Sequence, residues 1–291
     1  MIVMRNMIVI GIGEILWDLL PEGKQLGGAP ANFAWHAQQL GACGVVISAV
    51  GGDQYGKEIL DLIRQRKLGN GISVSEKPTS VVEVKLKNGI PDYIIHEDVA
   101  WDNIELNLEA VDALVRADAL CFGSLAQRSR FSHETISRAI DMTPECCLKV
   151  FDINLRQHFY NKDMIRESLQ KADVFKLNNE ELLEIKELFQ LRGNDEAVCS
   201  KILKAYELKM VVLTGGDQGS MLLTSSEISE LKTPKTDVGD TIGAGDAFTA
   251  AVTMGILHDL PLKEIHEKAV KISAFVCTRS GAMPVLPPGI M

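Results

Sequence analysis

The stretch GVVISAVGGDQYGKEILDLIRQRKL, residues 44–68, joins an apolar, β-branched run to a helical pattern, and this pairing decides the fold class. The run at 44–50 is almost continuously apolar, as expected for a strand that is buried on both faces. After it, Asp53 stands where a helix N-cap is expected, and the pattern from Gln54 to Leu68 is typical of a helix. The stretch therefore predicts one strand followed by one covering helix.

The same alternation recurs along the chain. A second helical pattern runs from Pro30 to Leu40 and ends before Gly41. Further strand-like runs lie at 6–12, 118–123, 147–152, 173–177 and 209–214. Strands that alternate with helices predict an α/β fold, here a doubly wound, mostly parallel sheet with helices on both faces. We expect residues 1–291 to form a single domain of this kind.

Two regions break the alternation and predict a small β lid. Residues 14–20 (EILWDLL) continue past the first strand. Val81–Leu86 and Tyr93–His96 flank Asn88-Gly89, a dipeptide that favours the type I′ turn of a hairpin. We expect segments at about 14–26 and 80–100 to leave the main sheet and cover its carboxyl edge, which is where open α/β sheets bind ligands.

Composition and charge favour small-molecule chemistry. Hydrophobic residues make up 46% of the chain, and the formal net charge of -9 repels nucleic acid and anionic membranes. The apolar start, Met1–Glu14, is too short for a signal peptide or a membrane span, and the uncharged run Gln25–Gly52 is too polar. The six cysteines form no CxxC pair, which predicts a reducing cytoplasm.

The stretch Asp240-Thr241-Ile242-Gly243-Ala244-Gly245-Asp246-Ala247-Phe248 places glycines where a helix begins. Gly243 and Gly245 let backbone N–H groups converge, and the helix dipole adds positive charge, so the turn can hold a phosphate or a developing anion. Asp246 lies at the same place, where its carboxylate can accept a proton from a hydroxyl that attacks a phosphoryl group. The alternative is that Asp246 only caps or charges the first helical turn.

Residues 26–32 (LGGAPAN) place paired glycines before another helix, so that the backbone at Gly28 can approach a polyol and Asn32 lies in the first turn. Upstream, Asp18 is a lone carboxylate in a mostly apolar strand. Such a group is either solvated at a sheet edge or hydrogen-bonded to the hydroxyls of a ligand.

Three further motifs follow predicted strands. Asn178 and Glu181 have the spacing of a helix cap, and the alternative is a water-mediated contact with Mg²⁺ and phosphates. The segment 214–219 (TGGDQG) suits a tight turn or a phosphate contact. Arg156 follows the strand at 147–152 at the presumed ligand edge, where it can neutralise a transferring phosphate.

The sequence lacks the motifs of three common kinds of site: P-loop nucleotide sites, dinucleotide-binding turns and transition-metal sites. The chain has no GxxxxGK[ST] loop, so P-loop nucleotide binding is not expected. Gly11-Ile12-Gly13 resembles a dinucleotide turn, but position 16 is Leu where the third glycine would stand. The six histidines show neither HExxH nor paired Cys/His spacing, so no transition-metal site is indicated.

Taken in order, these motifs resemble those of the ribokinase-like (PfkB) carbohydrate kinases, and within them the fructokinase-like members. The resemblance spans essentially the whole chain and rests on five segments: LGGAPANFA, NNEE, TGGDQG, DTIGAGDAF and RSGAMP. It implies a doubly wound α/β body with a β lid, MgATP as phosphoryl donor and a sugar hydroxyl as acceptor.

The resemblance also implies roles for individual residues. Asp246 would be the catalytic base, with Gly243, Ala244 and Gly245 as the anion hole and Arg156 nearby. The remaining roles are sugar binding by Asp18, Gly28 and Asn32, the magnesium shell at Asn178 and Glu181, and the ATP side at Thr214, Gly216 and Gly219. A monovalent-cation (K⁺) site is implied at Asp240, Ile242, Val276, Arg279 and Gly281. Val285 stands where some relatives have a serine, which leaves potassium dependence open.

The segments GEILWDLLPEG (13–23) and GIPDYIIHEDVAWDNI (89–104) are similar to those of fructokinases and supply no basic pair for a sugar phosphate. A free sugar, fructose first, is therefore expected. The alternatives are a kinase of ribose or 2-keto-3-deoxygluconate, a catalytically silent sugar-binding regulator, and a nicotinamide-dependent dehydrogenase. Lid strands that would otherwise expose their edges predict a homodimer through the lid.

Overall fold

The computed structural model describes residues 7–20, 23–87, 90–235 and 239–290. Within these residues a nine-stranded sheet has the order β13-β12-β11-β10-β9-β8-β1-β4-β5. Its strands from β5 to β11 pair in parallel, and β12 and β13 add an antiparallel edge. The strands are β1 (Ile8–Ile12), β4 (Cys43–Gly51), β5 (Gly69–Ser75), β8 (Ala119–Phe122), β9 (Leu148–Asp152), β10 (Val174–Asn178), β11 (Met210–Thr214), β12 (Ser220–Leu223) and β13 (Ile228–Leu231).

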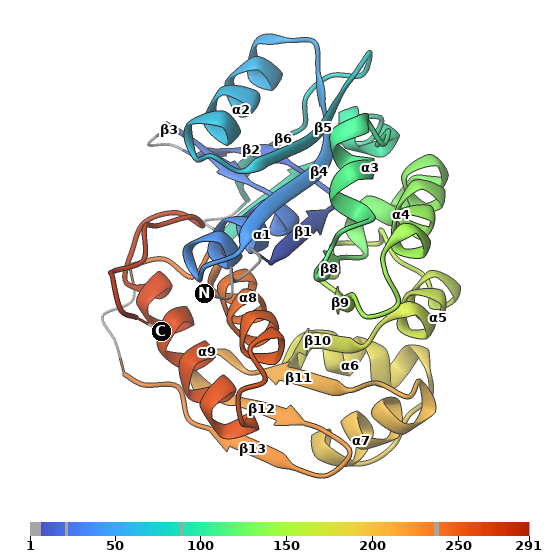
Figure 1. The fold of residues 1–291 in the computed structure, drawn as a ribbon, viewed down its shortest axis with the longest axis vertical. Helices are drawn as coiled ribbons and strands as arrows, with labels where there is room; N and C mark the ends of the chain where they lie inside the picture. Colours follow the sequence, from blue (N-terminus) through green and yellow to red (C-terminus); the bar gives the residue numbers. More distant parts are fainter. Residues whose placement is uncertain (1–6, 21–22, 88–89, 236–238, 291) are drawn as a thin grey trace, which may run out of the picture.

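Helices cover both faces of this sheet (Figure 1). One face carries α3 (Leu108–Leu114), α4 (Arg130–Met142), α5 (Lys162–Lys171), α6 (Asn179–Leu188) and α7 (Asp195–Ala205). The other carries α1 (Ala29–Gln39), α2 (Gln54–Gln65), α8 (Ala244–Leu257) and α9 (Leu262–Cys277). The doubly wound α/β prediction is confirmed.

Successive side chains of each strand point to opposite faces of the sheet and pack into the core on both sides of it. Ile10 and Ile12 of β1 pack toward the α3–α7 layer, whereas Val9 packs toward α1 and α8. A strand buried on both faces needs apolar side chains at successive positions, which explains the continuous runs in the sequence. On the first side, Phe122, Phe151 and Phe175 stack across β8, β9 and β10 with ring centroids 5.3 and 5.6 Å apart.

A separate four-stranded sheet forms the lid, in the order β3-β2-β6-β7. Its strands are β2 (Leu16–Leu20), β3 (Gly23–Gly27), β6 (Val81–Lys87) and β7 (Ile90–Ile95). β2 begins four residues after β1 ends, so it leaves from the carboxyl edge of the main sheet. β6 and β7 pair antiparallel. The predicted turn at Asn88-Gly89 lies outside the described residues.

Four strands were not expected from the sequence: β3, β5, β12 and β13. β3 (GKQLG) and β5 (GNGISVS) are rich in glycine and polar residues, which have low strand propensity. They become strands because they pair with β2 and β4, respectively. Within the described residues, no helix is long and apolar enough to cross a membrane.

Candidate active site

The start of α8 forms the centre of the candidate site. Gly243 is the N-cap residue with a left-handed φ of 78°, and a Cβ there would lie 2.5 Å from the carbonyl oxygen of Ala282. Only glycine fits this turn without strain. The first helical turn, at Ala244, Gly245 and Asp246, has no preceding turn whose carbonyls could accept all of its N–H groups. These N–H groups and the helix dipole make the turn suitable for an anion.

Asp246 lies in this first turn and contacts the neighbouring helix. Its Oδ2 accepts a hydrogen bond from Asn32 Nδ2 at 2.7 Å. Burial raises the pKa of Asp246 to about 6, and the nearby Asp152 carboxylate raises it further, whereas Asn32, Lys176 and Arg156 oppose the shift. A carboxyl group with this pKa is mostly ionised at neutral pH and is a better proton acceptor than an ordinary aspartate.

A buried ionic network that sequence reasoning missed lies beneath the turn. Lys176 Nζ donates to Asp152 Oδ1 at 2.9 Å, and Thr249 Oγ1 donates to Asp152 Oδ2 at 2.8 Å. The Lys176 ammonium would lie 3.3 Å from a Cβ on Gly245, so it reaches the underside of the turn. Burial alone lowers the pKa of Lys176, but the Asp152 carboxylate and other acidic groups raise it above its usual range. The positively charged Lys176 ammonium therefore lies directly beneath the turn, and the Asp152 carboxylate balances its charge.

Asp18 and Gly28 lie on the lid side of the same site. Gly27 leaves room for the Asp18 carboxylate, because a Cβ on Gly27 would be 2.2 Å from Asp18 Oδ2. Burial raises the pKa of Asp18 to about 6, with Arg156 opposing this and Asp240 adding to it. Gly28 is the N-cap residue of α1, whose first turn carries Asn32. Asn32 Oδ1 is buried and has no hydrogen-bond partner within the described residues.

Glu14 is a second group that the sequence analysis did not assign. It follows β1, is 3% exposed, and its Oε2 atom has no hydrogen-bond partner in the described part of the chain. Burial raises the pKa of Glu14 to about 7, while hydrogen bonds from the backbone at Glu14 and Ala29 and the charge of Arg156 lower it. Asp246 is close enough to raise it further. The only sequence signal was a carboxylate directly after an apolar strand.

Asn178 and Glu181 form a capping box at the start of α6. Asn178 Oδ1 accepts from the Glu181 N–H at 2.9 Å, and Glu181 Oε2 accepts from the Asn178 N–H at 2.7 Å. Glu181 Oε1 also accepts from the Leu155 N–H at 3.0 Å. Both interpretations from the sequence remain compatible with this geometry, but the capping one accounts for every contact seen. The side chains of Asn178 and Glu181 offer oxygen atoms, which are the ligands that Mg²⁺ prefers. The Glu181 lone pairs that accept no hydrogen bond from the protein suit a water-mediated contact.

Thr214 is the last residue of β11, and Gly216 and Gly219 lie in the turn between β11 and β12. The Gly215 N–H donates to the Gly219 carbonyl at 2.7 Å, so the segment closes on itself as expected of a tight turn. Gly216 and Gly219 have φ angles of 58° and 113°. Asn179, which follows the capping residue Asn178, donates to Gln218 at 3.2 Å. This contact places the turn beside the start of α6.

Arg156 is exposed just beyond β9. Its Nη1 donates to the Leu155 carbonyl at 2.9 Å. Its charge acts on Glu14, Asp18 and Asp246, lowering the pKa of each. The guanidinium is therefore near all three carboxyl groups of the site.

The segments expected to hold a monovalent cation are joined through Asp240. Its Oδ1 accepts from the Ile242 N–H at 3.0 Å, and its Oδ2 accepts from the Gly281 N–H at 3.1 Å. The Val276 carbonyl accepts from the Arg279 N–H at 3.0 Å. Val276 lies in the last turn of α9, and the other four residues come from the two adjoining loops before α8 and after α9. Their oxygen atoms suit a hard cation, although several of those oxygens already accept hydrogen bonds.

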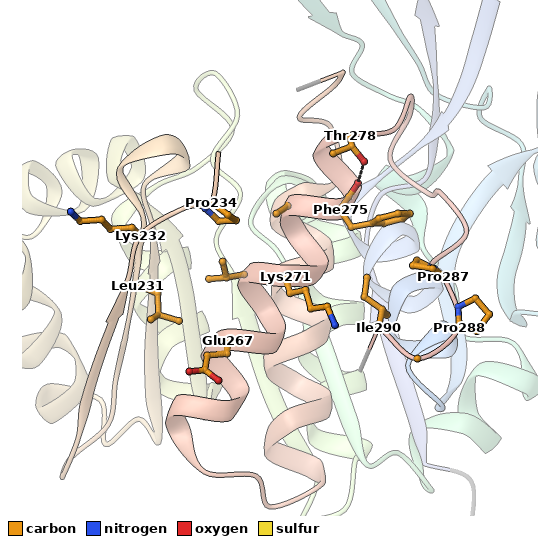
Figure 2. Close-up of a pocket in the computed structure, with 13 residues that line it drawn as sticks. Leu231, Lys232, Pro234, Glu267, Lys271, Phe275, Thr278, Pro287, Pro288 and Ile290 are labelled. Atoms are coloured by element: carbon orange, nitrogen blue, oxygen red, sulfur yellow. Dashed lines mark hydrogen bonds between the residues drawn. The ribbon is translucent and has the colours of Figure 1, made fainter. Parts of the chain in front are cut away.

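An open groove of about 620 Å³ runs along α9, next to the strand β13 (Figure 2). Its lining includes Leu231 and Pro234 on one side, Phe275 on α9, Thr278 just after the end of α9, and Pro287 on the C-terminal segment. The end of α9 adjoins the anion turn, because the N–H groups of Gly239 and Asp240 both donate to the Cys277 carbonyl, at 2.8 and 3.2 Å. None of Asp18, Asn32 and Asp246 lines this groove.

Comparisons with known proteins agree with this geometry. A family model described as pfkB family carbohydrate kinase matches residues 22–288. The chain is 31% identical to PH1459 of Pyrococcus horikoshii, with 94% of this chain and 91% of that protein covered. The solved ATP complex of PH1459, described as an uncharacterized sugar kinase, has a TM-score of 0.76 at 29% identity, covering 94% of this chain and 93% of that one.

Two fructokinases are also similar. Fructokinase-2 of Zea mays is 28% identical, with 97% of this chain and 92% of that protein covered. The crystal structure of a fructokinase from Xylella fastidiosa with bound ATP has a TM-score of 0.82 at 20% identity, covering 96% of this chain and 94% of that one. At 20% identity, the likeness to the Xylella fastidiosa structure concerns the fold alone.

Proposed function

Because this chain belongs to the PfkB family of carbohydrate kinases, we propose that it transfers the γ-phosphoryl group of MgATP to a hydroxyl of free fructose. The observation that carries the proposal is the position of Asp246. Its carboxylate lies in the first turn of α8, beside the anion turn, and is bonded to Asn32 of the lid-side helix α1. One side chain thus lies between a phosphate-binding turn and a site for hydroxyl groups.

In the proposed reaction Asp246 accepts the proton of the attacking hydroxyl. The sugar oxygen then forms its bond to the γ-phosphorus, and the bond from that phosphorus to the β–γ bridging oxygen breaks, so that ADP leaves with the electron pair. The N–H groups of Gly243, Ala244 and Gly245 stabilise the negative charge on the transferring group, and Arg156 adds a positive charge. General-base assistance of this kind contributes on the order of 10² to 10⁴ in rate.

The sugar lies against the lid in this proposal. The Asp18 carboxylate accepts hydrogen bonds from sugar hydroxyls, and the unpartnered Asn32 Oδ1 accepts another. Gly28 lets the start of α1 pack against the end of β1, because a Cβ there would lie 2.4 Å from the Glu14 carbonyl oxygen. Because an unpaired buried acceptor costs free energy, Asn32 Oδ1 is better satisfied with a polyol bound than without it. The lid side of the site is acidic apart from Arg156, and the Lys176 ammonium beneath the turn is paired with Asp152, so the site suits a neutral sugar better than a sugar phosphate.

ATP lies on the other side of the turn. We place the nucleoside at the Thr278 end of the groove along α9 and the phosphates between the anion turn and the 214–219 turn, with Thr214, Gly216 and Gly219 contacting them. Asn178 and Glu181 would hold Mg²⁺ through water. The oxygens of Asp240, Ile242, Val276, Arg279 and Gly281 would hold a monovalent cation. When bound, the two metal ions would supply positive charge that lowers the barrier to phosphoryl transfer.

A sugar panel with MgATP tests the proposal, with ADP release as the readout. Fructose should give the highest kcat/KM among fructose, ribose, 2-keto-3-deoxygluconate and hexose phosphates. A tenfold preference for another sugar, about 1.4 kcal/mol of transition-state discrimination, would reject fructose and retain the kinase. Sugar binding without any sugar-dependent ADP release would instead indicate a silent sugar-binding regulator.

A further inference from the structure

A cavity lies behind the lid and touches the candidate active site at Gly281, in the loop proposed to hold a cation. It has a volume of about 410 Å³, within the range of small-molecule sites. Three parts of the chain line it: the lid strands β2 and β3, the C-terminal end of α2, and the loop at 280–283. Trp17 and Leu26 pair across β2 and β3, and both line the cavity. Asp18, the next residue of β2, does not line it.

Arg66 is the most informative residue of this cavity. Its guanidinium carbon lies 4.7 Å from the centroid of the Trp35 ring, and its Nη1 contacts the Met283 sulfur. Burial lowers the pKa of Arg66. Among the residues that the structure describes, no carboxylate forms an ion pair with it. A half-buried guanidinium without a carboxylate is costly unless an anion completes its hydrogen bonds.

The other polar groups of the cavity are those that an anion needs. Lys24 lines it and lies 4.8 Å from the Trp17 ring and 4.7 Å from the Tyr55 ring, paired with Glu58 at the edge. The Gln25 amide and the Ser280 hydroxyl add uncharged donors. A planar guanidinium, an ammonium and neutral donors together match the oxygens of a phosphate group.

We propose that this cavity binds the phosphate group of a small molecule, at a site separate from the one where phosphoryl transfer takes place. Arg66 forms the bidentate contact, with Lys24, Gln25 and Ser280 around it. The position links the site to both halves of the proposed active site. Gln25 pairs with Asp18 across the lid strands, and Gly281 donates to Asp240 of the anion turn at 3.1 Å. An anion here would tie the lid to the body.

Tryptophan fluorescence offers a direct test, because two of the three tryptophans, Trp17 and Trp35, flank the cavity. We would titrate the purified protein with inorganic phosphate, and separately with fructose 6-phosphate, at constant ionic strength. The wild-type protein should give a saturable change with at least one of them. A lower Kd for the hexose phosphate would identify a metabolite site, and equal values a site for free phosphate.

Variants of α2 make the test specific. Arg66→Gln should weaken binding by about tenfold to a hundredfold, the effect of losing a charged hydrogen bond, and Arg66→Lys should weaken it less. Arg64→Gln is the matched control, because Arg64 lies on the same helix, is exposed and pairs with Asp61. Thermal unfolding of each variant checks the fold. Unchanged binding in a folded Arg66→Gln protein, or a signal that saturating MgATP abolishes, would overturn the proposal.

Discussion

At the scale of single residues, the site is defined by carboxyl groups that hold protons more tightly than usual. Burial is the main cause for Glu14, Asp18 and Asp246, whose pKa values rise to about 7, 6 and 6. Arg156 opposes the shift in all three. Raised pKa values that are clustered around an anion turn are typical of a functional site. Their different surroundings support different roles: Asp246 at the turn, and Asp18 at the lid.

Asp18→Ala should raise the KM for sugar and leave the KM for ATP nearly unchanged. A hydrogen bond to a charged group contributes roughly 1.5 to 3 kcal/mol, which corresponds to about a tenfold to a hundredfold change. Steady-state kinetics with each substrate varied in turn measure both constants. Asp18→Asn is the conservative control, since it keeps the shape and one acceptor. An unaltered sugar KM in a folded Asp18→Ala protein would assign Asp18 to a solvated strand edge.

At the scale of secondary-structure elements, the capping box of α6 allows a test of two roles for Asn178: capping the helix, and shaping the magnesium shell. Asn178→Ala removes the bond to the Glu181 N–H and should cost about 0.5 to 2 kcal/mol of stability. Asn194→Ala is the matched control, because Asn194 caps α7 through the Ala197 N–H and is not part of the proposed site. Denaturant unfolding should show similar losses for both variants.

The dependence of kcat/KM on Mg²⁺ concentration then distinguishes the two roles. If Asn178 and Glu181 shape the magnesium shell, only the Asn178→Ala variant requires more Mg²⁺ for half-maximal activity. Identical magnesium curves for both variants would leave Asn178 with the capping role alone.

The sequence predicted the strands that are buried on both faces and the motifs that lie within one turn of chain. The turn at 240–248 and the pair Gly28 and Asn32 could be proposed as site residues because the patterns that mark them lie within short segments. Long-range arrangements could not be predicted: Asp152, Lys176 and Thr249 come from β9, β10 and α8 and meet only in the fold. β3 and β5 have weak propensity and form because their neighbours offer free edges, which a single segment cannot show.

At the scale of the whole molecule, the lid should mediate a homodimer. The lid sheet has two edge strands, β3 and β7, and a four-stranded sheet of this kind exposes unpaired backbone groups at its edges. Pairing with a second lid would cover them. Sedimentation at micromolar concentration should give twice the chain mass of 31.9 kDa. A monomeric mass would count against the dimer.

The raised pKa values also predict how global stability depends on pH. Glu14 titrates at about 7 in the folded protein and at its ordinary value of 4.5 when unfolded, so the folded state binds more protons between these values. The free energy of unfolding should therefore fall as the pH rises through this window. Glu14→Gln should make that decline shallower, as measured by denaturant unfolding at several pH values. The same slope in the variant and the wild type would contradict the assignment.

The most direct test of the catalytic account is the turnover of Asp246→Asn at saturating fructose and MgATP. Asparagine keeps the size of the side chain and most of its hydrogen bonding but cannot accept the proton. We expect kcat to fall by on the order of 10² to 10⁴, with thermal stability and ATP affinity little changed, and the acid limb of the wild-type kcat profile, near pH 6, to disappear. If Asp246 only charges a helix start, the variant would lose about 0.3 to 1 kcal/mol of stability and turn over at nearly the wild-type rate. That result would contradict the role of Asp246 as the base.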